Sequence, residues 1–230
     1  MKSPLARTFR GRTFEASALQ FLDASFVKNF ERAFREERGS ACFLVCYESR
    51  RRQEWSRRDF KQKVDQEIEE LKKTDAEIHL IVGGNRIETL VRIVATLVLG
   101  RAVLPINPAE GTLRLEQHLK NLESYSVRVL VDSNLDESWA PFRQHTRAAL
   151  VREPRYAQKP FILIPTSGTT GVSKLVIQLE SSVISNVDAL IESHGFQNAR
   201  VLATALPVFH VNALEFSFFC ALFSEAKLVL

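Results

Sequence analysis

The sequence FILIPTSGTTGVSKLVIQL occupies residues 161–179 and places hydroxyl residues and glycines between two apolar segments. The segments 161–165 and 175–179 have the composition of short strands, and the polar stretch between them closes on Lys174. Such a loop brings backbone N–H groups close to an anion, adds hydroxyl donors and supplies one positive charge. The stretch therefore predicts a polyphosphate-binding loop that joins the two strands of a hairpin.

The residues around Lys174 exclude a Walker A loop. That loop ends in Gly-Lys-Ser/Thr and opens a helix, whereas here Ser173 precedes the lysine, Leu175 follows it and a strand pattern comes next. The predicted phosphate-binding residues are Thr166, Ser167, Gly168, Thr169, Thr170, Gly171 and Lys174. The alternative interpretation is a turn rich in Gly, Ser and Thr that binds nothing.

Residues 166–174 resemble the phosphate-binding signature of the adenylate-forming (AMP-binding) superfamily, which includes acyl-CoA synthetases, aryl-CoA ligases, luciferases and peptide-synthetase adenylation domains. That superfamily usually has proline before the lysine, where this chain has Ser173, a change that removes no ligand atom. The stretch ALPVFHVNAL, residues 205–214, resembles a second segment of the superfamily, which lines the acyl pocket. The resemblance assigns His210 to that pocket as a lining and gating residue; the alternative is a structural histidine at a strand-to-helix turn.

A weaker resemblance covers residues 89–108, which read as an apolar helix, a stop at Gly100 and a buried strand that ends in Pro105-Ile106-Asn107-Pro108. Residues 127–132 resemble the strand that follows in the superfamily. We expect these segments to carry packing rather than chemistry.

The resemblance implies an N-terminal part of an ATP-dependent carboxylic acid:CoA ligase, which forms an acyl adenylate and then a thioester. ATP is the expected nucleotide, and Mg²⁺ and coenzyme A are expected for the complete enzyme. Later motifs of the superfamily, including Tyr-Gly-x-Thr-Glu and a C-terminal catalytic lysine, are absent from the 230 residues. We therefore expect a truncated chain that is inactive alone and needs its missing C-terminal part, or a partner subunit. A homodimer is a further expectation.

The substrate class follows from the second segment. Phe209 and His210 have no acidic neighbour in sequence, so the segment offers no partner for a buried substrate ammonium group. A small carboxylic acid without an α-amino group is expected. Luciferase-like chemistry, or a carrier protein in place of coenzyme A as the acceptor, stays open within the superfamily. Two other functions also stay open: a non-catalytic short paralogue that acts as an interaction subunit, and a general nucleotide-binding protein.

Composition is that of a globular domain, with 45% hydrophobic and 25% charged residues and a net charge of +4. The arginines of residues 50–58 are interpreted as a solvated turn rather than a nucleic-acid surface, because acidic residues accompany them. The histidines and the three cysteines lack metal-ligand or disulfide spacing, which favours a reducing cytoplasm and predicts no metal site. Residues 1–14 have a transit-peptide composition, although a frayed arm is preferred, and charges within 87–106 argue against a membrane span.

The alternation of predicted strands and helices along the chain predicts an α/β fold of mostly parallel sheets layered with helices. A first subdomain is expected over 1–135, a linker-like segment over 136–159 and the start of a second subdomain over 160–230. Helices are expected at 16–37, 58–73, 86–99, 112–123, 182–193 and 212–223. Strands are expected at 41–47, 78–82, 102–106, 127–132, 161–165, 175–179, 201–206 and 227–230.

Overall fold

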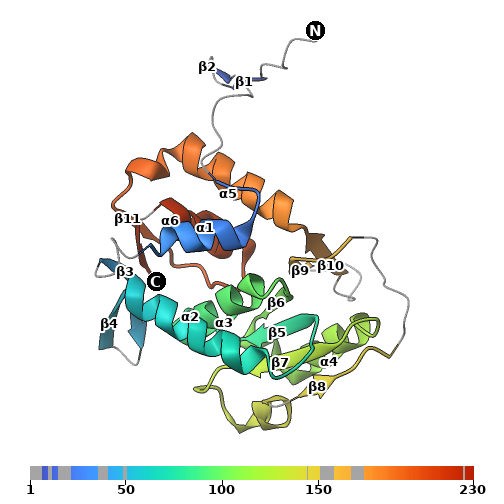
Figure 1. The fold of residues 1–230 in the computed structure, drawn as a ribbon. Coiled ribbons are helices and arrows are strands. Elements are labelled where there is room, and N and C mark those ends of the chain that lie inside the picture. The colour runs from blue at the N-terminus through green and yellow to red at the C-terminus, as the bar shows by residue number, and fades with distance from the viewer. Residues whose placement is uncertain are drawn as a thin grey trace.

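The computed structural model describes residues 7–9, 12–14, 22–35, 41–48, 51–143, 145–150, 158–166, 174–224 and 226–230. These residues form an α/β fold with one six-stranded sheet, one four-stranded sheet and helices between them (Figure 1). A separate ribbon pairs β1 (Arg7–Phe9) with β2 (Arg12–Phe14) in antiparallel register. The predicted fold class is confirmed.

The six-stranded sheet has the order β10-β9-β6-β5-β7-β8. Its parallel centre consists of β6 (Ala102–Ile106), β5 (Ile78–Val82) and β7 (Val127–Val131), and β9 (Ile162–Thr166) joins β6 in parallel. β8 (Thr146–Arg147) and β10 (Lys174–Gln178) are antiparallel edge strands. Every residue of β5 and β6 is buried, which is why mostly apolar runs, interrupted only by His79, predicted these strands with the correct bounds.

The four-stranded sheet has the order β11-β12-β3-β4. β11 (Val201–Ala203), β12 (Lys227–Val229) and β3 (Cys42–Glu48) are parallel, and β4 (Arg51–Ser56) is antiparallel to β3. Figure 1 shows β3 and β4 on the opposite side of the helices from β9 and β10.

The interpretation of residues 50–58 as a turn is wrong over its described residues, 51–58. Residues 51–56 form the edge strand β4, whose charged side chains remain accessible and suit an edge. Arg57 is only 3% exposed, and its guanidinium donates to the carbonyls of Ala33 and Leu222 at 3.2 and 3.3 Å. It also lies over the rings of Phe34 and Phe43, so this arginine is part of the core.

Six α-helices are present in the described residues: α1 (Phe26–Ala33), α2 (Arg57–Leu71), α3 (Ile87–Val98), α4 (Gly111–Asn121), α5 (Glu180–His194) and α6 (Cys220–Ser224). A π-helical segment, η5 (Asn212–Phe219), leads into α6, and short 3₁₀ turns are η2 (Pro108–Glu110), η3 (Glu137–Phe142) and η4 (Phe196–Asn198). The predicted helix 16–37 is too long: in its described part, the helix starts after Ser25, whose side chain accepts from the N–H of Lys28.

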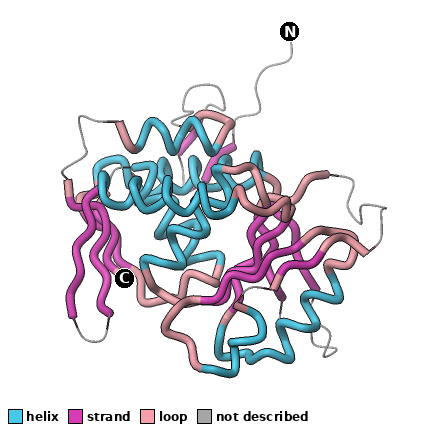
Figure 2. The backbone as a smooth tube through the Cα atoms, turned by 60° about the horizontal axis from the view of Figure 1, so that its bottom comes forward, coloured by secondary structure: helices cyan, strands magenta, loops and turns pink. Residues whose placement is uncertain are grey.

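Alternation along the strands divides the core into two clusters on the two faces of the six-stranded sheet. The larger cluster lies between the sheets, where Figure 2 shows most of the helices, and is rich in phenylalanine. Phe26 is completely buried there and makes edge-on ring contacts with Phe161, Phe219 and Phe223. The smaller cluster packs α4 and Trp139 against the other face.

The two sheets do not separate at the predicted linker. β9 and β10 from residues 160–230 join the sheet of β5, β6 and β7, and β11 and β12 join β3. The described part of 136–159 contributes η3 and the edge strand β8, which pairs with β7. Each sheet thus combines strands from both predicted subdomains.

Candidate functional site

The predicted phosphate hairpin is present at its two described ends. β9 and β10 pair in antiparallel register with Thr166 opposite Lys174, and the Thr166 hydroxyl donates to the carbonyl of Lys174 at 3.2 Å. Lys174 begins a strand rather than a helix, which confirms the exclusion of a Walker A loop. The other predicted phosphate-binding residues, Ser167, Gly168, Thr169, Thr170 and Gly171, lie outside the described residues.

The segment that carries His210 leaves the four-stranded sheet earlier than predicted. β11 ends at Ala203, because the N–H of Leu206 turns back to the hydroxyl of Thr204 and Pro207 has no N–H to donate. The N–H of His210 donates to the carbonyl of Pro207 at 2.9 Å, which closes a turn just before η5. His210 is exposed at this turn.

A pocket of about 350 Å³ lies between this turn and the carboxyl ends of two strands. Its walls come from the end of β6 and the start of η2, from the end of β9, and from the turn that follows β11. Its lining residues are Pro105, Asn107, Glu110, Ile164, Pro165, Leu206, Phe209, His210, Val211 and Asn212. The fold therefore brings His210 next to the hairpin strand that ends at Thr166, as expected of a ligand site at strand ends.

Residues 105–107 do more than the packing that the sequence predicted. Pro105 and Asn107 line the pocket, and the Asn107 side chain also accepts from the N–H of Ala109 at 3.0 Å, which starts η2. The Asn-Pro pair marks such a helix start, so capping chemistry was the available signal for this wall.

The pocket also contains a carboxylate that sequence proximity did not reveal. Glu110 reaches the wall from η2, about one hundred residues before His210, and its Oε2 lies 3.4 Å from Nε of Arg114. The absence of an acid beside Phe209 and His210 in sequence therefore does not extend to the pocket. Its described walls offer a carboxylate, an imidazole and two amides.

A buried polar cluster supports the same edge of the sheet. Asp132 follows β7 and has no exposed surface; its Oδ2 accepts from the Thr89 hydroxyl at 2.5 Å and its Oδ1 lies 3.3 Å from Nη1 of Arg92. Burial raises the pKa of Asp132 to about 6. A Cβ on Gly83 would lie 2.3 Å from Oδ2, so only glycine allows the turn after β5 to approach this carboxylate.

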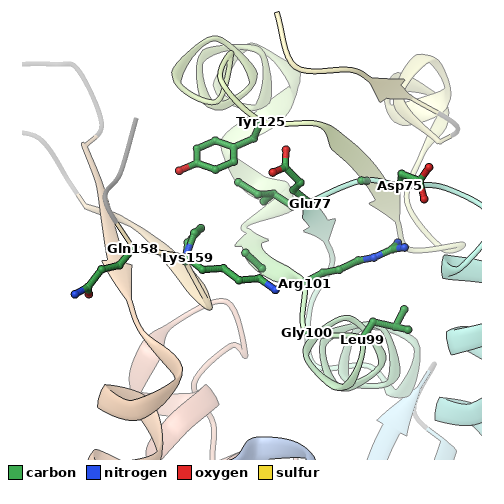
Figure 3. A pocket seen from close by; sticks show the side chains of 12 residues that line it. Asp75, Glu77, Leu99, Gly100, Arg101, Tyr125, Gln158 and Lys159 are labelled. Atoms are coloured by element: carbon green, nitrogen blue, oxygen red, sulfur yellow. The ribbon is translucent and has the colours of Figure 1, made fainter. Parts of the chain in front are cut away.

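A larger pocket, about 460 Å³, opens at the opposite edge, where β5 and β6 begin (Figure 3). Lys159 extends toward Gly100 across this pocket, and Glu77 and Tyr125 lie on the far wall. Of the predicted site residues that the structure describes, Thr166, Lys174 and His210, none lines it. We therefore take the smaller pocket as the candidate site, because His210 lines it and the larger pocket holds no described site residue.

Within the described ranges, no three His, Cys, Asp or Glu side chains gather as a metal site requires. Among the helices described, none combines the length and apolar character needed to cross a bilayer.

Three solved structures illustrate what the fold is similar to. A structure of apo MatB from Rhodopseudomonas palustris is 18% identical with a TM-score of 0.68, over 89% of this chain and 45% of that one. A fatty acyl-adenylate ligase from L. pneumophila, in complex with acyl adenylate and pyrophosphate, is 15% identical with a TM-score of 0.74, over 92% and 41%. The o-succinylbenzoate CoA synthetase MenE from Bacillus subtilis is 21% identical with a TM-score of 0.68, over 88% and 43%.

The chain thus spans less than half the length of each of these three proteins. No curated protein sequence matched it. The model of one family, the AMP-binding enzymes, matches residues 30–230, which include the hairpin and the segment around His210. This match confirms the resemblance drawn from the two motifs, and the chain belongs to the AMP-binding enzyme family.

Proposed function

We propose that this chain supplies the phosphate-binding and acid-binding part of an ATP-dependent carboxylic acid:CoA ligase. The observation that carries the proposal is the register of the hairpin. Thr166 and Lys174 face each other at the mouth of the loop, and the preceding residues of β9, Ile164 and Pro165, line the pocket that contains His210. A nucleotide at the hairpin and an acid in the pocket would be neighbours.

The hairpin mouth suits a polyphosphate. Lys174 is exposed, and no carboxylate in the described residues pairs with its ammonium group, so its charge is available to an anion. The hydroxyl of Thr166 is engaged by the backbone of Lys174, which holds the two strands together at the point where the loop begins. The proposed phosphate ligands also include Ser167, Gly168, Thr169, Thr170 and Gly171.

The apolar walls of the pocket suit the body of a small carboxylic acid, and the Glu110 carboxylate on the same walls would pair with a cationic group if the acid carries one. Ile164, Leu206 and Phe209 provide apolar surface for the body of the acid, and His210 provides a polar group on the same wall. In the proposed reaction the carboxylate joins AMP with release of pyrophosphate, and the acyl group then passes to coenzyme A with release of AMP. The role of the described residues is to hold the acid against the nucleotide. Mg²⁺ belongs to the proposal, although the described residues contain no cluster for it.

Binding of ATP to the purified chain tests the first half of the proposal. Calorimetry should detect binding in the wild type and in Lys120→Ala, a control that removes an exposed lysine from α4, but at least tenfold weaker binding in Lys174→Ala. Equal affinity of all three proteins would contradict the assignment of Lys174.

An acid tests the second half. Octanoate and benzoate serve as aliphatic and aromatic probes, and at least one should strengthen ATP binding in the wild type but not in His210→Ala. ATP binding that no acid changes would favour a general nucleotide-binding protein. Absence of ATP binding would favour the non-catalytic interaction subunit. Carboxylate-dependent ATP–pyrophosphate exchange, measured with the same proteins, tells whether the chain can form the adenylate by itself.

A further inference from the structure

The turn after β5 holds the segment that carries His210, although the two are far apart in sequence. Nδ2 of Asn85 donates to the carbonyl of Leu206 at 3.1 Å, and Oδ1 of Asn85 accepts from the N–H of Val208 at 2.8 Å. These bonds join residues 121 and 123 positions apart. One side chain therefore fixes the backbone on both sides of Pro207.

A carboxamide is suited to this position because it offers a donor and an acceptor side by side. The backbone between Leu206 and Val208 presents a carbonyl and an N–H with the same spacing, as the edge of a strand does. Pro207 has no N–H, so the segment cannot continue the ladder of β11. Asn85 supplies the pairing that the sheet does not.

The turn after β5, which carries Asn85, is itself held firmly in place. Gly83 packs against the buried Asp132 so closely that a Cβ would clash, and the N–H of Arg86 donates to the carbonyl of Gly84 at 2.8 Å. Val208, at the other end, is completely buried. Both ends of the contact are thus fixed to the core, and the Asn85 side chain transmits the position of β5 to the segment 206–208.

His210 depends on that segment for its own position. Its N–H donates to the carbonyl of Pro207, between the two residues that Asn85 grips, and its carbonyl accepts from Leu214 in η5 at 3.0 Å. Asn85 itself does not line the pocket. We infer that Asn85 is a positioning residue, which holds the Pro207–His210 turn so that the imidazole stays at the pocket wall. The functional meaning of this role rests on the proposed function, whereas the clamp itself does not.

The test uses NMR on the whole 230-residue chain. In Asn85→Ala, the amide protons of Val208 and His210 should exchange with solvent about tenfold faster than in the wild type, because both hydrogen bonds to the segment are lost. Asn85→Asp keeps the acceptor for Val208, so its amide should remain protected. Asn134→Ala is the matched control, since Asn134 is an exposed asparagine at the same edge of the sheet.

The NMR resonances of the histidine side chains tell whether Asn85 positions His210 alone or stabilises the whole fold. The chain has five histidines, and ¹³C-labelled histidine gives a resonance for each, that of His210 being assigned with His210→Gln. In Asn85→Ala the His210 resonance should move while those of His79 and His118, both completely buried, stay in place. Unchanged His210 and Val208 signals would overturn the inference. Movement of all five resonances would also overturn it, because Asn85 would then support the whole domain.

If Asn85→Ala fails to fold, the Asn85→Asp variant tests the inference instead. Loss of the donor to Leu206 alone should still move the His210 resonance, and an unchanged resonance in a folded Asn85→Asp protein refutes the clamp. None of these measurements contains ATP or an acid. Failure of the clamp and failure of the proposed function are therefore distinguishable.

Discussion

His118 allows a sharp test of how the core responds to pH. It lies on α4 with no exposed surface, on the side that also carries Leu115, Leu119 and Leu122. Within the part of the chain that the structure describes, neither ring nitrogen has a hydrogen-bond partner. Burial, together with the charge of Arg114, lowers the pKa of His118 from 6.5 to about 4.

The sign of the effect follows from proton linkage. Because the folded-state pKa is lowered, the unfolded chain binds a proton at His118 that the folded chain rejects, so stability is lost as pH falls below 6.5 and the loss levels off below about 4. Between pH 7 and pH 5 this one group should lower the free energy of unfolding by about 2 kcal/mol. Other groups titrate in the same range, so only a comparison of variants isolates it.

His118→Leu replaces the imidazole by an apolar side chain in an apolar cluster. The variant should be more stable than the wild type at pH 7, because a buried group without hydrogen bonds is removed, and its advantage should grow by about 2 kcal/mol at pH 5. Urea unfolding at both pH values measures this as a further separation of the midpoints by about 1 M. Gln117→Ala, an exposed neutral neighbour on α4, is the control.

The outcome that refutes the reasoning is a constant difference. If the free energy of unfolding falls by the same amount in wild type and His118→Leu between pH 7 and pH 5, the pKa of His118 is not lowered by folding, and the folded protein is protonated there at pH 5. An NMR titration of the labelled imidazole reports this directly, since its resonance should keep its neutral position down to about pH 5.

Three further predictions concern the supports of the fold and the site. Phe26→Ala should lower the free energy of unfolding by about 3–5 kcal/mol, because it empties a completely buried position with three ring contacts; a loss below about 1 kcal/mol in urea unfolding would contradict this packing. Arg57→Leu should cost about 2–3 kcal/mol despite its apolar side chain, because the carbonyls of Ala33 and Leu222 lose a charged donor, and an unchanged midpoint would show that these bonds add nothing. Asp132 has a raised pKa, so its contribution to stability is present at pH 4 and lost as pH rises through about 6; Asp132→Asn should flatten the pH dependence over that range, and an unchanged slope would place the carboxylate in a more solvated setting.

Local patterns predicted those parts of the fold in which one segment determines its own structure. The runs at 78–82 and 102–106 are buried on both faces, so their largely apolar composition located them. The segment 51–56 did not look like a strand, because its structure comes from pairing with β3 and its charged side chains Arg51, Arg52 and Glu54 are exposed. The excess length of the helix predicted at 16–37 has a similar cause, since its apolar period did not reveal the cap at Ser25.

The candidate site divides in the same way. His210 and Lys174 were predicted as site residues because they belong to compact motifs. Glu110 and Asn85 were not, because Glu110 shares its pocket with residues about one hundred positions away and Asn85 bonds to residues 121 and 123 positions away. No rule of sequence spacing predicts that such residues meet. They meet because the order of the strands in the sheet brings their segments together.

That order also explains why the chemistry gathers at one edge. β5, β6 and β9 are neighbours with parallel directions, so their carboxyl ends meet, and Asn85, Asn107 and Thr166 each lie at or just after one of these ends. The first holds the His210 segment, the second starts η2 and lines the pocket, and the third closes the hairpin. Had β7 rather than β6 been the neighbour of β9, the carboxyl end of β7 with Asp132 would lie beside Thr166, and an anion would meet a buried carboxylate. Because β7 lies on the far side of β5, the Asp132 carboxylate is kept away from the hairpin. It packs instead against Gly83, in the turn from which Asn85 extends.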